Sequence, residues 1–123
     1  MKEAMIVGLG GCVGSMGRYL IGGLLLHQAG SMKFPLSTFL INVAGCLLIG
    51  ILGGLGERHH ITLDAKLFLM TGVLGGFTTF SAFGLETMSL LKRGDVGIAA
   101  LYAGLSVALG VAAVWAGFRA AAG

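Results

Sequence analysis

The segment MTGVLGGFTTFSAFGLE, residues 70–86, places glycines, threonines and a serine in the middle of an otherwise apolar run. Regular helix is not expected to persist where Gly75-Gly76 precedes Thr78-Thr79, because flexibility and polar groups are concentrated there. A break at membrane depth is tolerated only where it is buried in protein or lines a cavity, and its freed carbonyls can bind ions. The alternative is a glycine-kinked packing helix whose hydroxyls bond to the preceding turn. We favour the break.

Four long apolar runs account for most of the chain, and this segment lies in the third of them. A helix needs about 20 consecutive apolar residues to cross the hydrocarbon core of a bilayer, and each run is long enough. The polar residues gather in connections that are too short for another domain. We therefore expect an all-α membrane protein, a single four-helix transmembrane domain whose third helix is broken in mid-membrane. The expected spans are residues 4–26, 34–56, 65–91 and 96–118.

The composition suits lipid better than water. Hydrophobic residues make up 56% of the 123 residues and charged residues only 11%, and the mean hydropathy is +0.95. The charged shell of a soluble domain is therefore missing. The net charge of +3 is too small and too scattered for nucleic-acid binding. We expect a multi-pass protein of the cell inner (plasma) membrane.

Glycine, with 23 of the 123 residues, recurs at a spacing that favours close helix packing. Small residues four positions apart let two helix backbones approach each other in lipid. We predict that these small faces lie in contacts between helices. The pairs are Gly10 and Gly14, Gly50 and Gly54, Gly72 and Gly76, and Ala100 and Gly104.

The loop charges predict no preferred orientation in the membrane. Cytoplasmic loops normally carry the excess of Lys and Arg. Here one side, with both termini and the second loop, holds four such residues, and the other side holds three. A chain without orientation bias can insert either way, so we expect an antiparallel, dual-topology homodimer whose interface lines a pathway. The four are Lys2, Arg58, Lys66 and Arg119, and the three are Lys33, Lys92 and Arg93.

A lone amide, Asn42, lies in the middle of the second run, one helical turn after Thr38. An amide in lipid costs free energy unless a partner satisfies it. Two interpretations stand side by side. Asn42 either forms a hydrogen bond between helices, or it directs its NH2 donor at an anion in a pore. Tyr102 and Ser106, one turn apart, are the polar residues of the last run.

Two aromatic residues and one charge complete the candidates. Phe80 and Phe83 share a face if helix resumes after the break, although such a pair more often serves packing alone. Arg18 is the only full charge deep in the first span. It either snorkels to the membrane interface or supplies positive potential that gathers anions.

Nothing in the sequence indicates an enzyme. The three histidines lie in loops without Cys or carboxylates at metal-ligand spacing, so a metal site built on them is not expected. The spans contain neither a Ser-His-Asp arrangement nor a pair of carboxylates.

Over nearly its whole length the sequence resembles the CrcB/Fluc family of fluoride channels. Three segments carry the resemblance: GGCVGSMGRY in the first span, PLSTFLINVAGCLLIG in the second and TGVLGGFTTFSAFGLE in the third. The family's usual run reads TTFSTF, so Ala82 stands here in place of a threonine and one hydroxyl is missing.

The resemblance implies an antiparallel homodimer with two narrow pores. It implies that Asn42 is an anion donor and that Phe80 and Phe83 line the pore. A structural sodium ion at the dimer centre would be held by the backbone carbonyls of Gly75 and Thr78. Further candidates for the fluoride pathway are Thr79, Ser81, Tyr102, Ser106 and Arg18.

The function that the resemblance implies is passive fluoride efflux, which protects a cell from fluoride toxicity. Fluoride holds its water tightly, so a pore must replace that shell with donors such as amide N–H, hydroxyls and the positive edges of phenyl rings. One alternative is a small dual-topology multidrug or cation exporter, which requires a carboxylate in its first span, where this chain has Arg18. Another is a non-transporting membrane assembly subunit, which has no need for Asn42 or a third-span break.

Overall fold

The computed structural model describes residues 1–29 and 32–123, and these are helical except for short connections. Apolar runs without interior proline favour helices throughout, since a helix satisfies its own backbone hydrogen bonds. The segments are α1 (Lys2–Ala29), α2 (Leu36–Arg58), α3 (Leu63–Lys66), the π-helix η1 (Leu67–Leu74), α4 (Gly75–Phe77), α5 (Phe80–Lys92) and α6 (Val96–Ala122).

Four helical stretches in the described part of the chain are long and apolar enough to cross a membrane. This confirms the predicted all-helical chain with four long apolar helices. The third stretch contains four of the segments, from α3 to α5. The stretches are Lys2–His27, Leu36–Arg58, Leu63–Lys92 and Val96–Ala122.

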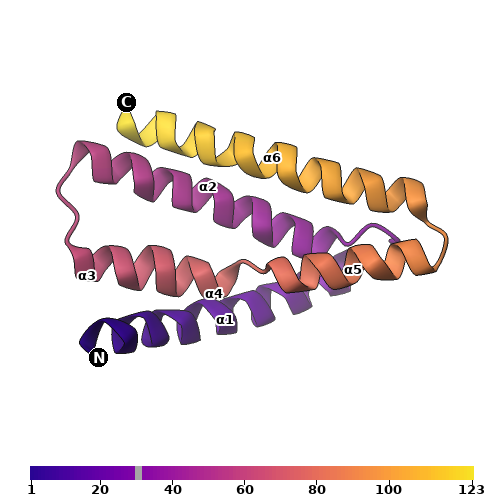
Figure 1. The fold of residues 1–123 in the computed structure, drawn as a ribbon, viewed down its shortest axis with the longest axis horizontal. Coiled ribbons are helices and arrows are strands. Elements are labelled where there is room, and N and C mark those ends of the chain that lie inside the picture. The colour runs from indigo at the N-terminus through magenta and orange to yellow at the C-terminus, as the bar shows by residue number, and fades with distance from the viewer. Residues whose placement is uncertain (30–31) are drawn as a thin grey trace.

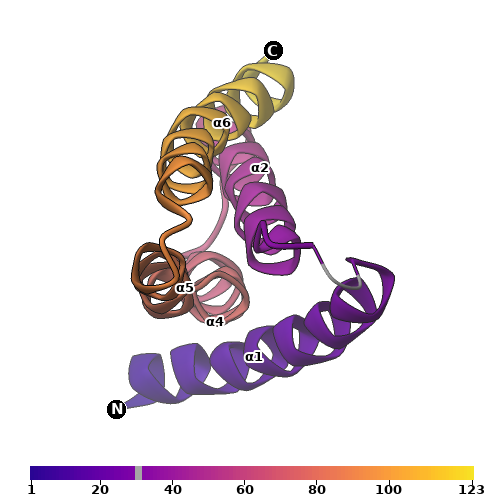
Figure 2. The same ribbon diagram turned by 90° about the vertical axis from the view of Figure 1, so that its right-hand side faces the viewer.

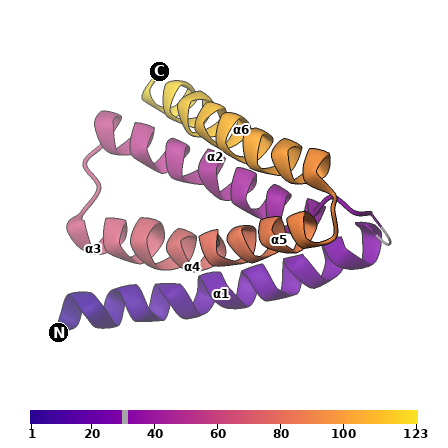
Figure 3. The ribbon, with the colours of Figure 1, turned by 45° about the vertical axis from the view of Figure 1, so that its right-hand side comes forward.

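The helices form two packed pairs. Figure 1 shows α2 and α6 side by side, with the α3-to-α5 stretch running along α1. Seen from the end, α1 and α6 lie on opposite sides, with α2, α4 and α5 between them (Figure 2). Both chain ends lie at the same end of the molecule as the α2–α3 connection (Figure 3). Exposed leucines, valines and methionines cover the outer faces, as expected for surfaces that meet lipid.

Glycines allow α2 and α6 to touch backbone to backbone. A Cβ atom on Gly50 would collide with the carbonyl oxygen of Val114, and one on Gly117 with the carbonyl oxygen of Leu47. Because any side chain at these positions would separate the helices, glycine is required by the close approach. We call this contact the α2·α6 seam.

A second glycine contact joins α1 to the third stretch. A Cβ atom on Gly14 would collide with the carbonyl oxygen of Val73, and one on Gly76 would lie 2.6 Å from the carbonyl oxygen of Gly11. The predicted packing role of the first three glycine pairs is thus confirmed. The fourth prediction is wrong within this chain: Ala100 and Gly104 are exposed, because α6 turns a different face, with Gly117, toward α2.

The connection between α5 and α6 is a helix C-cap closed by glycine. Gly94 has a φ of 84°, the left-handed conformation that glycine adopts without steric cost. The N–H of Gly94 donates to the carbonyl of Leu91 and the N–H of Asp95 to that of Leu90, which is the Schellman pattern. The Asp95 carboxylate then lies 3.6 Å from Lys33 Nζ, so it ties this turn to the segment before α2.

Candidate functional site

The third stretch is interrupted between α4 and α5. Thr78 has φ −85° and ψ 158°, and Thr79 has φ −148° and ψ 121°, so both residues are extended. Helix resumes at Phe80, where Thr79 is the N-cap and its Oγ1 accepts a hydrogen bond from the N–H of Ala82 at 3.2 Å. A threonine in extended conformation is a favourable start for a helix.

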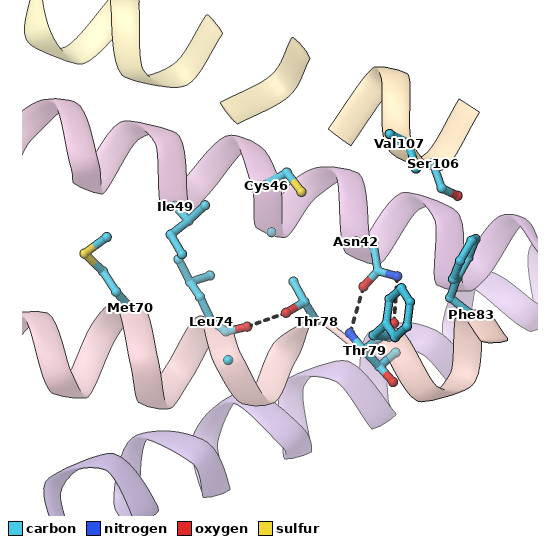
Figure 4. A pocket seen from close by; sticks show the side chains of 13 residues that line it. Asn42, Cys46, Ile49, Met70, Leu74, Thr78, Thr79, Phe83, Ser106 and Val107 are labelled. Atoms are coloured by element: carbon cyan, nitrogen blue, oxygen red, sulfur yellow. Dashed lines mark hydrogen bonds between the residues drawn. The ribbon is translucent and has the colours of Figure 1, made fainter. Parts of the chain in front are cut away.

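Asn42 of α2 fills the gap in the backbone hydrogen bonds. Its Oδ1 accepts from the N–H of Thr79 at 2.8 Å, and its Nδ2 donates to the carbonyl of Thr79 at 2.9 Å. Figure 4 shows the amide facing Thr79. One amide therefore satisfies both backbone groups of one extended residue. A primary amide carries two N–H donors, and among the described residues only Thr79 accepts from Asn42, so one donor is left.

Arg18 of α1 supplies another of the missing bonds. Its Nε donates to the carbonyl oxygen of Gly76 at 3.1 Å. In an uninterrupted helix that carbonyl would accept from the N–H of Phe80, which now begins a new helix. Arginine near a helix C-terminus commonly caps the last carbonyls in this way. Neither Arg18 nor Asn42 is close in sequence to the segment that it holds.

The interruption leaves further carbonyls without their helical donors, among them those of Gly75 and Thr78. The N–H that would bond to Gly75 belongs to Thr79 and donates to Asn42 instead. The N–H that would bond to Thr78 belongs to Ala82 and donates to Thr79 Oγ1. Both residues line the same pocket. Hard cations bind to carbonyl oxygens of this kind, so this pair fits the sodium ligands implied by the family resemblance.

A pocket of about 360 Å³ opens beside the interruption (Figure 4). Asn42, Phe80, Phe83 and Ser106 line it together with Gly75, Thr78 and Thr79. The two rings lie with centroids 5.6 Å apart. Phe80 is 83% exposed, so most of its surface is not covered by the described residues. The pocket is therefore an open recess on one side of a single copy, and apolar residues surround its few polar groups.

Tyr102 does not line this pocket, because it is fully buried next to it. Its hydroxyl donates to Glu86 Oε1 at 3.0 Å, and Thr38 Oγ1 donates to Glu86 Oε2 at 3.0 Å. The tyrosine ring lies 5.0 Å from that of Phe83. Glu86 thus joins α2, α5 and α6 through a partly buried carboxylate. This contact was not predicted from the sequence, although Glu86 follows Phe83 by three residues and shares its helix face.

The remaining candidates fall in different places. Ser81 is exposed, and its hydroxyl lies 3.3 Å from that of Thr79. Arg18 and Thr79 line a second, larger groove together with Ala82. The structure thus brings Asn42, Thr79, Phe80, Phe83 and Ser106 together, whereas Arg18 and Ser81 lie outside that pocket. In the part of the chain that is described, no cluster of His, Cys, Asp or Glu could hold a metal ion.

The amino-acid sequence was compared with known protein families and proteins. Residues 5–118 match the family described as CrcB-like protein, Camphor Resistance (CrcB). The fluoride-specific ion channel FluC of Methylobacillus flagellatus is 49% identical over 120 residues, which cover 97% of this chain and 94% of that protein. The proteins of the same name from Agrobacterium fabrum and Flavobacterium psychrophilum are each 45% identical over 118 residues, covering 95% of this chain and 94% of each relative.

Proposed function

This chain belongs to the CrcB family, and we propose that it is a fluoride-selective ion channel through which the anion leaves the cell passively. The family consists of ion channels, not enzymes. Four apolar helices and bacterial channel relatives make the chain a multi-pass protein of the plasma membrane. The observation that carries the proposal is the pocket in which the Asn42 amide and the rings of Phe80 and Phe83 lie together.

The pocket contains the donors that a dehydrated anion needs. The second N–H of Asn42 supplies one hydrogen bond, and the hydroxyls of Thr79 and Ser106 supply further polar contacts along the wall. The Ser81 hydroxyl lies outside the pocket, 3.3 Å from that of Thr79, and would extend the polar path there. Phenyl rings carry partial positive charge at their edges, so Phe80 and Phe83 stabilise an anion without holding it as firmly as a full charge would. Weak contacts at several positions let the ion move on. Tyr102 contributes by keeping Glu86 hydrogen-bonded beside the pathway.

A second copy completes the pathway in this proposal. The pocket is open on one side and Phe80 is exposed, so a partner placed there would close it. The near tie in loop charge, four against three, supports an antiparallel, dual-topology homodimer. Reporters fused to the C-terminus of the unmodified chain should appear on both sides of the membrane. A single orientation would contradict this arrangement.

A structural sodium ion at the dimer centre is the finer part of the proposal. The carbonyls of Gly75 and Thr78, whose helical donors are diverted, would hold it in mid-membrane. A bound cation offsets part of the cost of desolvating an anion near it. Arg18 adds positive potential on the other side of the interruption.

Fluoride export by this route needs neither ATP hydrolysis nor proton coupling. In an acid medium neutral HF enters a cell and dissociates near neutral pH, and the inside-negative membrane potential then drives the fluoride ion outward. The test is fluoride efflux from liposomes that contain the purified protein, measured with an ion-selective electrode beside chloride efflux. Fluoride flux without chloride flux is expected. Proton-coupled cation flux would support the exporter instead, and no flux would support an assembly subunit.

A further inference from the structure

A groove of about 660 Å³ lies between the second half of α1, α2 and the start of α5. Arg18, Tyr19, Leu20, Leu24, Ile41 and Ala82 are among its lining residues. It is separate from the pocket that holds Asn42 and the phenyl rings, and the two share only Thr79. Its volume lies in the range of sites that bind small molecules, about 300–1,000 Å³.

The charge in this groove is uncompensated. An arginine side chain carries five N–H donors, and Arg18 uses its Nε on the carbonyl of Gly76. Within residues 1–29 and 32–123, no carboxylate forms an ion pair with Arg18. Glu86 already accepts hydrogen bonds from Thr38 and Tyr102. No described residue therefore uses the two terminal amino groups of Arg18, and these can bind an anionic ligand.

Apart from Arg18 and the hydroxyls of Tyr19 and Thr79, most of the groove lining is apolar or already hydrogen-bonded. The hydroxyl of Ser37 donates to the carbonyl of Gly22 at 3.1 Å, and that of Thr38 donates to Glu86. Leu20, Leu24 and Ile41 supply apolar wall. At position 82 the wall carries only the methyl group of an alanine, so it is apolar here as well.

We propose that this groove binds a single-chain amphipathic organic anion, of the alkyl sulfonate or fatty-acid class. The head group lies on the terminal amino groups of Arg18, where a guanidinium can bind oxyanions through two parallel hydrogen bonds. The alkyl tail lies against Leu20, Leu24, Ile41 and Ala82. Charge complementarity selects an anion over a cation, and the apolar wall selects an alkyl tail over a small inorganic ion. The negative head group of a bound ligand neutralises the positive charge of Arg18.

Binding is tested directly by native mass spectrometry of the purified protein with decane-1-sulfonate. We expect one adduct per chain, which methanesulfonate and decyltrimethylammonium do not form. Arg18→Gln should weaken the adduct at least tenfold. The matched control is Arg119→Gln, because Arg119 is exposed and stacks 5.8 Å from the Trp115 ring at the far end of α6; it should leave the adduct unchanged. Equal adducts in both variants, or displacement of the sulfonate by phosphatidylglycerol, overturn the proposal.

Arg18→Gln also removes the bond to Gly76, so a second variant keeps the test independent of folding. Ala82→Thr introduces a hydroxyl into the wall without changing Arg18 and should weaken the adduct severalfold. Ala108→Thr, at an exposed position on α6, should not. If Ala82→Thr and Ala108→Thr bind equally, the assigned tail position is wrong.

The regulatory consequence rests on the proposed function. If the chain conducts fluoride, decane-1-sulfonate should lower the efflux severalfold, and Ala82→Thr should need correspondingly more of it with unchanged basal flux. Binding without any fluoride flux in the untreated protein would contradict the channel proposal and leave the ligand site standing. Full flux at saturating sulfonate would show that the site does not control conduction.

Discussion

The α2·α6 seam and the interruption between α4 and α5 accommodate polar backbone groups in opposite ways. Both regions bring polar backbone groups of two segments close together in an apolar setting. At the seam, Gly50 and Gly117 remove side chains so that two intact helices touch. At the interruption, Asn42 and Arg18 add side chains that replace missing backbone bonds. The interruption also borders both described cavities.

The difference shows where rigidity and function are placed. An unbroken helix has all its interior backbone bonds within itself, so the seam needs only shape. The interrupted segment depends on two side chains from other helices, and each of them keeps donors that no described residue uses. Those spare donors are what a passing or bound anion can contact. Substitutions should therefore act on stability at the seam and on flux at the interruption.

The seam should be the place where one added side chain does most harm. A Cβ atom on Gly117 would lie 2.9 Å from the backbone N of Ile51 and closer still to the Leu47 carbonyl oxygen. Gly117→Val should cost about 3 kcal/mol or more, since over-packing costs about 1–3 kcal/mol and occasionally more, and backbone cannot rotate away. The measurement is the yield of monodisperse protein and its thermal unfolding in detergent.

The control on the same helix is Gly97→Val, because nothing lies within 4 Å of a Cβ at that position. It introduces the same β-branched residue into α6 and should unfold within a few degrees of the wild type. Equal losses at both positions would show that helix propensity, not the seam, governs the result.

At the interruption, Asn42→Asp should lower fluoride efflux at least tenfold while the protein still folds. An ionised carboxylate still accepts from the N–H of Thr79, but it has no donor for the Thr79 carbonyl or for an anion. Its negative charge also repels fluoride. Efflux from liposomes is compared with the size-exclusion profile of each sample. Unchanged efflux from a normally folded variant would leave Asn42 with a packing role only.

Most of the fold could be predicted from the sequence, because in lipid each apolar segment must satisfy its own backbone hydrogen bonds. Apolar runs of sufficient length must be helical, so the four long helices follow from composition alone, and three of the four glycine pairs lie where they were expected. The face that α6 turns inward could not be deduced, because Gly104 and Gly117 look alike in sequence. Only the partner helix distinguishes them.

The site was predicted as a set of residues but not as a network. Asn42 and Thr79 are 37 positions apart, and Arg18 and Gly76 are 58 apart. No spacing rule connects residues so distant. The π-helix η1, which packs against α1, was also not predicted, since π-helices are rare and the local sequence gives no signal for one. Glu86 was assigned no partner, although it lies one turn after a predicted pocket residue.

Substitutions of the two phenyl rings distinguish a packing role from a role in conduction within the interrupted region. Phe80→Leu should leave stability unchanged, because the ring is 83% exposed in the chain. Phe83→Leu should cost under about 1.5 kcal/mol, as apolar exchanges of similar volume usually do. Both should lower fluoride efflux severalfold, because leucine has no positive ring edge.

The matched control for the rings is Phe39→Leu. Phe39 packs edge-on against Phe34 at 5.3 Å and does not line the pocket. Its substitution should lower stability slightly and leave the efflux per folded protein unchanged. Full efflux in both Phe80→Leu and Phe83→Leu would remove the rings from the pathway and reduce them to packing.

The smallest effect is expected at Thr78, and it distinguishes backbone from side chain in the sodium proposal. The Thr78 hydroxyl donates to the carbonyl of Leu74 at 2.9 Å, a carbonyl that also accepts the Thr78 N–H. Thr78→Val removes one of these two bonds, and a single hydrogen bond contributes about 1 kcal/mol. The Thr78 carbonyl, which is the proposed sodium ligand, stays in place. The variant should therefore keep the sodium dependence of the wild type, measured as thermal stability in sodium against N-methylglucamine buffers. Loss of that dependence would mean that the hydroxyl binds the ion, and equal stability of the wild type in both buffers would argue against the sodium site itself.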